Sequence, residues 1–366
     1  GERTKLVYKW PSNEDLWNKY AEMRADDLKA DGDGSVATEF YRKNQKKMDA
    51  GAAIAWESRF DPDEVSAIQH AYNLRLRDEA AFFSEYQNEP VIEEGSVGLL
   101  TADEIAEKVN GLKRLEVPQD AERLTAFIDI QSKVLYYTVT AWTPGFTGYV
   151  IDYGAYPKQS QQYYSLRSLE KTLQMVKRGA GLEGAIYAGL TALADQLHGV
   201  EYVRDDGAEL SLDLTLIDAN WGQSTDLVHQ FCRNTKYRGK IMPAHGRYVG
   251  AASKRFNEYA KKKGERNGYN WRIPSVKGKR VVRHILFDSN FWKSFLQARF
   301  SQPIGDSGSL SLFKARPSKH QMLADHVTAE YRTQTSGRGR SVDEWRLPPH
   351  KPDNHLLDCL SGCCVA

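Results

Sequence analysis

The stretch LTAFIDIQSKVLYYTVTAWTPGFTGYVIDYG, residues 124–154, decides the fold class of this chain. Three of its runs, 124–131, 133–142 and 148–154, are rich in β-branched and aromatic residues, and short turns separate them. Such runs predict strands, and the short connections predict a three-stranded antiparallel meander.

Helical and strand patterns alternate after the meander. Residues 182–198 and 224–234 have helical patterns, while 210–220 and 239–246 have strand patterns. Further helices are predicted at 291–300 and 318–334, and a terminal helix is predicted from Asp353. This order predicts an α/β domain, a mixed sheet flanked by helices.

The first part of the chain has a different pattern. Residues 12–89 read as one helix after another, ended by Pro90, without the alternation typical of strands. Residues 91–120 read as a link that contains one helix capped at Thr101. We therefore expect an all-helical segment at 1–95, a linker at 96–120 and the α/β domain at 121–366.

Composition places the chain in the soluble globular class. Hydrophobic residues make up 41% and charged residues 27% of the 366 positions, and no apolar run approaches the roughly 20 residues of a membrane span. The chain starts at Gly1 without a signal-peptide core, so we expect a fragment of a longer protein. The four cysteines lack the spacing of a zinc site and are expected to be reduced and buried.

Charge is distributed unevenly. Residues 1–100 hold 13 Lys/Arg and 20 Asp/Glu, which leaves 37 and 28 of the totals of 50 and 48 for the rest. A basic excursion at 250–285, interleaved with aromatics, is typical of a nucleic-acid contact surface, although a solvated loop and hairpin is the alternative. The candidate DNA contacts, including two arginines of a predicted Gly/Ser-rich loop at 331–341, are Lys254, Arg255, Lys261, Lys262, Lys263, Arg272, Lys277, Lys279, Arg280, Arg338 and Arg340.

Two aspartates lie in or after predicted strands. Asp129 interrupts an apolar strand, where a carboxylate must be paired, protonated or bound to a cation. Asp218 follows the apolar run LTLI, at the end of a strand where ligands of α/β sheets commonly bind. The alternatives are a solvent-facing acid at Asp129 and a helix cap at Asp218; Asp213 and Asp226 are less favoured neighbours.

A third aspartate lies on the predicted terminal helix. Helical spacing places Asp358 on a small polar side with Asn354, Ser361 and Gly362, opposite the leucines and cysteines. A solvated surface acid is the alternative. Three acids in this order could hold two hard divalent cations about 4 Å apart, as in metal-dependent phosphodiester hydrolysis.

Several motifs are absent from the sequence. The sequence contains no GxxxxGK[ST] motif and no GxGxxG motif after a strand, which argues against a phosphate loop or a dinucleotide fold. The histidines lack the paired spacing of a zinc site, and His355 is expected to have a capping or supporting role beside the acids.

These motifs carry a family resemblance. FIDIQ, LIDANWGQSTDLVHQFCR and NHLLDCL resemble the nuclease part of the large terminase subunit of tailed bacteriophages, in its lambda-type branch. FYRKNQKKMDAGAAIAWESRF and AIQHAYNLRLRDEAAFFSEYQNEP are similar to the segment that joins the family's ATPase to its nuclease. HQMLADHVTAEYRT and WRLPPHKPDNHLLDCL resemble its C-terminal pattern, and the resemblance is strongest at 38–90 and 320–366.

The resemblance implies an RNase H-like endonuclease that cuts concatemeric viral DNA during genome packaging with little sequence specificity. It implies Mg²⁺ or Mn²⁺, in two ions, held by the catalytic acids Asp129, Asp218 and Asp358, with Glu183 or Asp213 as alternatives for the second. The implied partners are double-stranded DNA, an ATPase motor domain that this sequence lacks, the small terminase subunit and the portal, in the host cytoplasm and without a membrane. A junction-resolving or transposase-like nuclease and a non-catalytic packaging module remain the alternatives.

Overall fold

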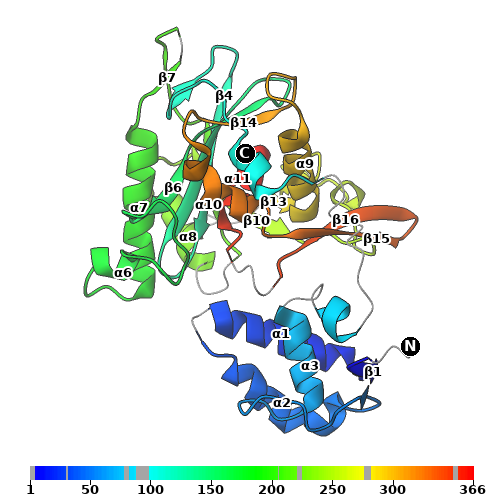
Figure 1. Cartoon of the computed structure of the whole chain (residues 1–366). Helices are drawn as coiled ribbons and strands as arrows, with labels where there is room; N and C mark the ends of the chain where they lie inside the picture. The colour runs from blue at the N-terminus through cyan, green and yellow to red at the C-terminus, as the bar shows by residue number, and fades with distance from the viewer. Residues whose placement is uncertain are drawn as a thin grey trace. The chain divides into compact units, whose positions relative to one another are not determined.

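The computed structural model describes residues 5–29, 32–77, 82–87, 99–204, 206–220, 225–275, 282–348 and 353–366. They fall into two compact units (Figure 1). The first comprises Gly1–Val97 with Arg346–Pro352, and the second Gly98–Trp345 with Asp353–Ala366, within these described ranges. No helix in the described ranges is long and apolar enough to cross a membrane.

The first unit is mainly helical, as predicted. Its helices α1 (Glu14–Lys29), α2 (Ser35–Met48) and α3 (Ala67–Arg77) enclose an aromatic core, in which Trp17 stacks on Tyr72 with ring centroids 3.6 Å apart. A π-helical turn, η1, spans Phe82–Tyr86. One feature was not predicted: β1 (Val7–Lys9) pairs antiparallel with β2 (Ala53–Ile54).

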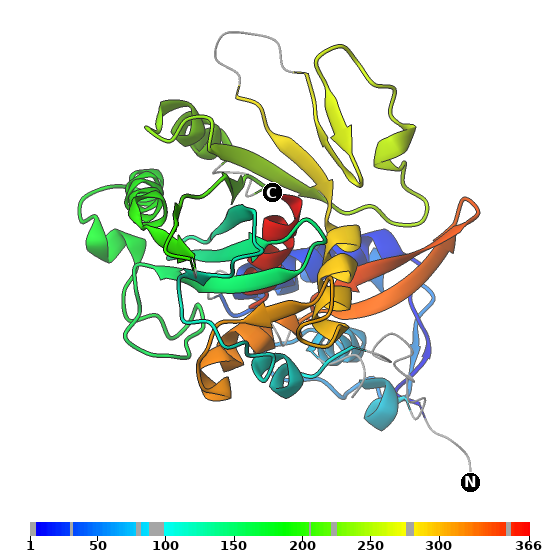
Figure 2. The ribbon, with the colours of Figure 1, turned by 90° about the horizontal axis from the view of Figure 1, so that it is seen from above.

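A nine-stranded mixed sheet forms the centre of the second unit and confirms the predicted fold class (Figure 2). The predicted meander is β4-β5-β6, between β9 and the edge strand β14, and only β5 and β12 run against the other strands. In spatial order the strands are β11 (Arg266–Gly268), β12 (Trp271–Ile273), β13 (Ile285–Asp288), β10 (Ile241–Arg247), β9 (Leu214–Asp218), β4 (Arg123–Ile130), β5 (Leu135–Trp142), β6 (Gly148–Tyr156) and β14 (Leu310–Leu312).

Helices cover both faces of this sheet (Figure 1). On one face lie α7 (Leu182–Gly199) and α8 (Thr225–Asn234); on the other lie α9 (Ser289–Ser301), α10 (Pro317–Val327) and α11 (His355–Val365). Successive side chains of a strand alternate between the faces. Thus Ile128 of β4 packs with α7 and α8, while Phe127 packs with α11, and Asp129 faces the α11 side.

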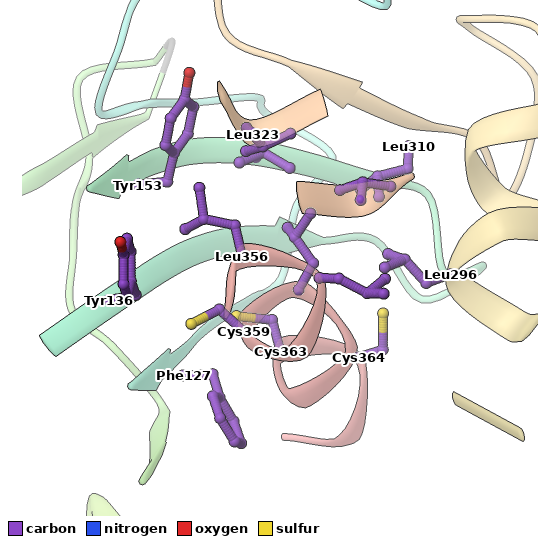
Figure 3. Close-up of a cluster of buried hydrophobic side chains, with 14 of the residues drawn as sticks. Phe127, Tyr136, Tyr153, Leu296, Leu310, Leu323, Leu356, Cys359, Cys363 and Cys364 are labelled. Atoms are coloured by element: carbon purple, nitrogen blue, oxygen red, sulfur yellow. The ribbon is translucent and has the colours of Figure 1, made fainter. Parts of the chain in front are cut away.

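The terminal helix α11 is more deeply buried than its sequence pattern suggested. Of its eleven residues only Asp358 is not buried. The predicted small polar side is packed rather than solvated, since a Cβ built at Gly362 would overlap the Phe127 ring. Leu356 and the buried, unpaired cysteines of the helix complete this contact (Figure 3). The absence of a side chain at residue 362 lets the helix approach β4 closely.

One predicted element was wrong in part. The helix expected at 318–334 ends at Val327, and the stretch expected as a loop forms a hairpin of β15 (Tyr331–Gly337) and β16 (Arg340–Arg346). Thr333 and Thr335 are β-branched and belong to the first strand of this hairpin. The remaining elements are α5 (Ala102–Ala106), capped by Thr101 as predicted, α6 (Leu173–Val176), the 3₁₀ turn η2 (Phe256–Glu258), and a small sheet of β3 (Glu116–Val117), β7 (Tyr202–Arg204) and β8 (Glu209–Leu210).

Candidate active site

Two of the predicted acids lie side by side at one edge of the sheet. β4 and β9 are parallel neighbours, and Ile128 pairs with Ile217. The next residues of the two strands are Asp129 and Asp218, so both carboxylates project from the carboxyl ends of adjacent strands onto the α11 face.

The third acid comes from the first turn of α11, which packs against β4. The negative charges of Asp129 and Asp358 both raise the pKa of Asp218, so the three carboxylates lie close enough to repel one another. The three residues are called the acid site below.

Asp129 is buried and strongly engaged. Its Oδ2 lies 2.9 Å from Nδ1 of His355 and accepts a hydrogen bond of 2.9 Å from the Gln131 side chain. Burial lowers the pKa of His355, but the contact with Asp129 and the negative charges of Asp129 and Asp353 outweigh this and raise that pKa to about 9. At this pKa His355 carries a positive charge at neutral pH and pairs with the Asp129 carboxylate.

Asp218 has the most perturbed environment of the three. Burial and the negative charges of Asp129 and Asp358 together raise its pKa to about 8, against a hydrogen bond of 3.2 Å from the Asn220 backbone N–H. A carboxylate in this position is costly to ionise unless a cation lies nearby.

Asp358 is held by a buried lysine. Nζ of Lys293, on α9, lies 2.9 Å from Oδ1 of Asp358 and also pairs with the buried Glu330. Burial raises the pKa of Asp358, opposed by Lys293, while Glu330 and Asp129 add to the rise. The Asn354 side chain donates to the same Glu330 oxygen, and the other Glu330 oxygen, Oε2, is buried and has no hydrogen-bond partner among the described residues.

The alternatives for the second acid lie elsewhere. Asp213 lies just before the other end of β9 and pairs with Arg123 at 3.2 Å. Glu183 and Asp226 belong to the first turns of α7 and α8, the helices of the opposite face. The geometry thus brings Asp218, and none of these three, beside Asp129.

The chemistry of this donor set fits divalent metal ions. Carboxylate oxygens are the ligands that Mg²⁺ and Mn²⁺ prefer, and mutual repulsion within the acid site is relieved by a bound cation. Among the described residues, one set of three possible metal ligands has all its ligand atoms within 4.8 Å of one another: Asp61, Glu64 and His70 of the first unit. The three carboxylates of the acid site are less closely grouped than this set. That group is internally hydrogen-bonded, with His70 Nδ1 2.6 Å from Glu64.

Several predicted DNA contacts are already used within the protein. Arg340 donates to the carbonyls of Gly250, Ala251 and Ser253, and Arg272 pairs with the buried Glu265 at 3.3 Å. These two arginines hold the basic excursion together.

The other predicted contacts in the described ranges are exposed. Lys254 lies over the Tyr259 ring, Arg255 and Arg338 lie near Glu258, and Lys261, Lys262 and Lys263 project into solvent. Lys277, Lys279 and Arg280 are outside the described residues. The excursion is attached to the sheet through β11 and β12, the edge strands that continue from β13.

Two members of the site's surroundings were missed from sequence. The sequence around Lys293 and Glu330 contains no motif that would mark either residue as part of a site. Their only visible signal is that Lys293 lies among the apolar residues of 291–300, where a solvated lysine would be unexpected.

Comparisons with known proteins give the family of this chain. A search of curated proteins finds no match. Among solved structures, the nuclease domain of the large terminase subunit gp2 of bacterial virus Sf6, a point mutant with manganese, is similar at 12% identity and a TM-score of 0.34, covering 71% of this chain and 99% of that one. The family model of the terminase large subunit gpA endonuclease domain matches residues 78–366, and the chain therefore belongs to this family of phage packaging nucleases.

Proposed function

We propose that the acid site is the catalytic centre of a divalent-metal-dependent endodeoxyribonuclease that cuts concatemeric viral DNA with little sequence specificity. The observation that carries this proposal is the convergence of Asp129, Asp218 and Asp358 from two adjacent strand ends and one helix. A carboxylate whose pKa is raised to about 8 does not stabilise a packed core, whereas acids with perturbed pKa values are common at catalytic sites.

Asp129, Asp218 and Asp358 would hold two Mg²⁺ or Mn²⁺ ions, for which carboxylate oxygens are preferred ligands. When bound, such ions would neutralise charge on the scissile phosphate and lower the pKa of an attacking water. His355 and Lys293 are positioning residues in this proposal. Each holds one carboxylate, Asp129 or Asp358, at 2.9 Å in the metal-free protein and fixes its direction.

The exposed lysines of the excursion are proposed to bind the DNA backbone. Lys261, Lys262 and Lys263 are consecutive and exposed, so they can each neutralise a phosphate without reading sequence. Replacing all three with alanine should reduce the slope of log affinity against log salt by about 2–3 and weaken binding alike for unrelated duplexes.

Asp129→Asn, Asp218→Asn and Asp358→Asn test the catalytic proposal directly. Each should reduce Mg²⁺- or Mn²⁺-dependent plasmid cleavage by more than roughly 100-fold, because even supporting residues of metal sites cost that much. Asp213→Asn is the matched control, from the same strand but outside the acid site, and should retain cleavage. Full activity of Asp358→Asn would remove the third acid from the proposal.

The finer biological role follows from the family alone. We propose that an ATPase motor domain, the small terminase subunit and the portal bring this nuclease to its DNA in the host cytoplasm. Cleavage confined to branched duplexes would favour a junction-resolving enzyme instead. Salt-sensitive DNA binding without cleavage under any divalent ion would favour a non-catalytic packaging module.

A further inference from the structure

Three histidines that are far apart in sequence meet on the face of the sheet opposite the acid site. His229 comes from α8, His245 from β10, and His284 directly precedes β13. Their ring centroids lie 5.7, 5.6 and 5.2 Å apart in the three pairs. Ala244 packs in the core on the α11 side, so the next residue of the strand, His245, projects to the α8 side.

Two of the rings are spaced as metal ligands are. Nε2 of His229 and Nε2 of His245 lie 3.4 Å apart. That separation is long for a hydrogen bond, for which about 2.9–3.0 Å is usual. Two imidazole nitrogens bound tetrahedrally to one zinc ion at about 2.0–2.1 Å are about 3.3–3.4 Å apart.

The tautomer of His245 suits a ligand. Its Nδ1 lies 3.3 Å from Oδ1 of Asn220, and the Asn220 amide group in turn donates to the Gly246 carbonyl at 3.0 Å, which orients its oxygen toward the ring. Because an amide oxygen can only accept, Nδ1 of His245 carries the proton. Nε2 therefore presents a lone pair, in the arrangement usual for metal-bound histidines, whose other nitrogen donates to a carbonyl or carboxylate.

All three rings are neutral at physiological pH, as metal ligands must be. Burial lowers the pKa of each. The His284 ring also lowers the pKa of His229, and burial with the His284 and His229 rings brings the pKa of His245 to about 4. Nδ1 of His284 is buried and makes no hydrogen bond of acceptable geometry with the described residues. A buried imidazole nitrogen without a partner is costly, and a metal bond would satisfy it.

We propose that His229, His245 and His284 bind one transition-metal ion of the class that prefers imidazole, Zn²⁺, Co²⁺ or Ni²⁺, at a site separate from the acid site. His229 and His245 already have the required nitrogen spacing. One nitrogen from each of the three rings does not yet lie within 4.8 Å of the others, so His284 would rotate on binding to supply the third ligand, with water as the fourth. Neutral nitrogen ligands discriminate against Mg²⁺, which favours carboxylate oxygen. The ion would therefore bind in the presence of excess Mg²⁺.

Zn²⁺ titration of tag-free protein, with excess Mg²⁺ to saturate carboxylates, tests this site. Isothermal calorimetry should show one Zn²⁺ per chain, and Co²⁺ should give the intense visible absorption of a four-coordinate complex. His245→Gln should weaken Zn²⁺ binding at least tenfold. Two controls should leave it unchanged: His198→Gln, a half-buried histidine whose ring stacks on Tyr237, and Asp358→Asn from the acid site.

A second measurement guards against unfolding of the variants. Zn²⁺ should raise the melting temperature of the wild type and of His198→Gln, but not that of His245→Gln or His229→Gln, and each metal-free variant should show wild-type circular dichroism. Absence of Zn²⁺ uptake by the wild type under excess Mg²⁺, or equal uptake by folded His245→Gln, would overturn the proposal. Nuclease activity is not the readout, so the result stands apart from the catalytic role of the acid site.

Discussion

Replacing Asp218 with asparagine should stabilise the metal-free protein while removing its nuclease activity. The pKa of Asp218 is raised from 3.8 to about 8. The folded state therefore keeps a proton that the unfolded chain releases, and ionising the folded protein costs stability as pH rises from about 4 to 8. Asparagine has no such cost.

The size of the gain follows from the shift. Each pKa unit corresponds to about 1.4 kcal/mol, so four units set an upper limit of about 6 kcal/mol at pH 8. Asp218 is half-buried and shares the repulsion with two other acids; solvent screening and redistribution of protons reduce the expected gain to about 2–3 kcal/mol. At about pH 4.5 the gain should nearly vanish.

Urea denaturation with EDTA at about pH 4.5 and pH 8 measures this difference. Asp213→Asn is the control, because Asp213 lies beyond the other end of the strand and accepts from the Leu124 backbone N–H at 2.8 Å. It should lose a little stability at both pH values. The reasoning is refuted if Asp218→Asn is no more stable than wild type at pH 8, or if its gain is the same at both pH values.

Three further variants probe the packing and charges around the acid site. Gly362→Ala should destabilise the domain by about 1–3 kcal/mol in urea denaturation, because its Cβ would overlap the Phe127 ring, whereas Gly199→Ala, with nothing within 4 Å of the new atom, should not. Lys293→Met should cost about 3–5 kcal/mol by leaving Glu330 and Asp358 without their cation, and adding Glu330→Gln should restore part of the loss. His355→Gln should lower the free energy of unfolding most below about pH 6.5 and least above about pH 9. The reason is that the raised pKa of His355 gives the wild type a stabilisation that disappears as pH rises through about 9. A loss of stability that is independent of pH would contradict this.

The sequence alone was sufficient to predict the strands that position the acid site. The meander, the strand before Asp218 and the terminal helix have clear hydrophobic patterns, and the structure contains all of them. A carboxylate inside an apolar strand then indicated Asp129, and an acid at the carboxyl end of a strand indicated Asp218, as candidate ligands. The choice of Asp218 over Asp213 or Glu183 as the second acid required knowledge of the pairing of β4 with β9, which is a tertiary property.

Other features could not be read from local patterns. Strands β13 and β14 are only four and three residues long, too short for periodicity to register. The 331–346 hairpin pairs locally, but its Arg340 holds the basic excursion through the carbonyls of residues 87 to 90 positions earlier, and no local pattern shows such a contact. His229, His245 and His284 span more than fifty positions, so no spacing rule reveals that a helix, a strand and a loop bring them together.

Anomalous diffraction at the manganese edge, from crystals soaked in Mn²⁺, tests the catalytic site most directly. The account predicts two peaks bounded by the carboxylates of Asp129, Asp218 and Asp358, and their loss in Asp218→Asn. Manganese bound elsewhere on the protein, with no peak between these three carboxylates, would contradict it.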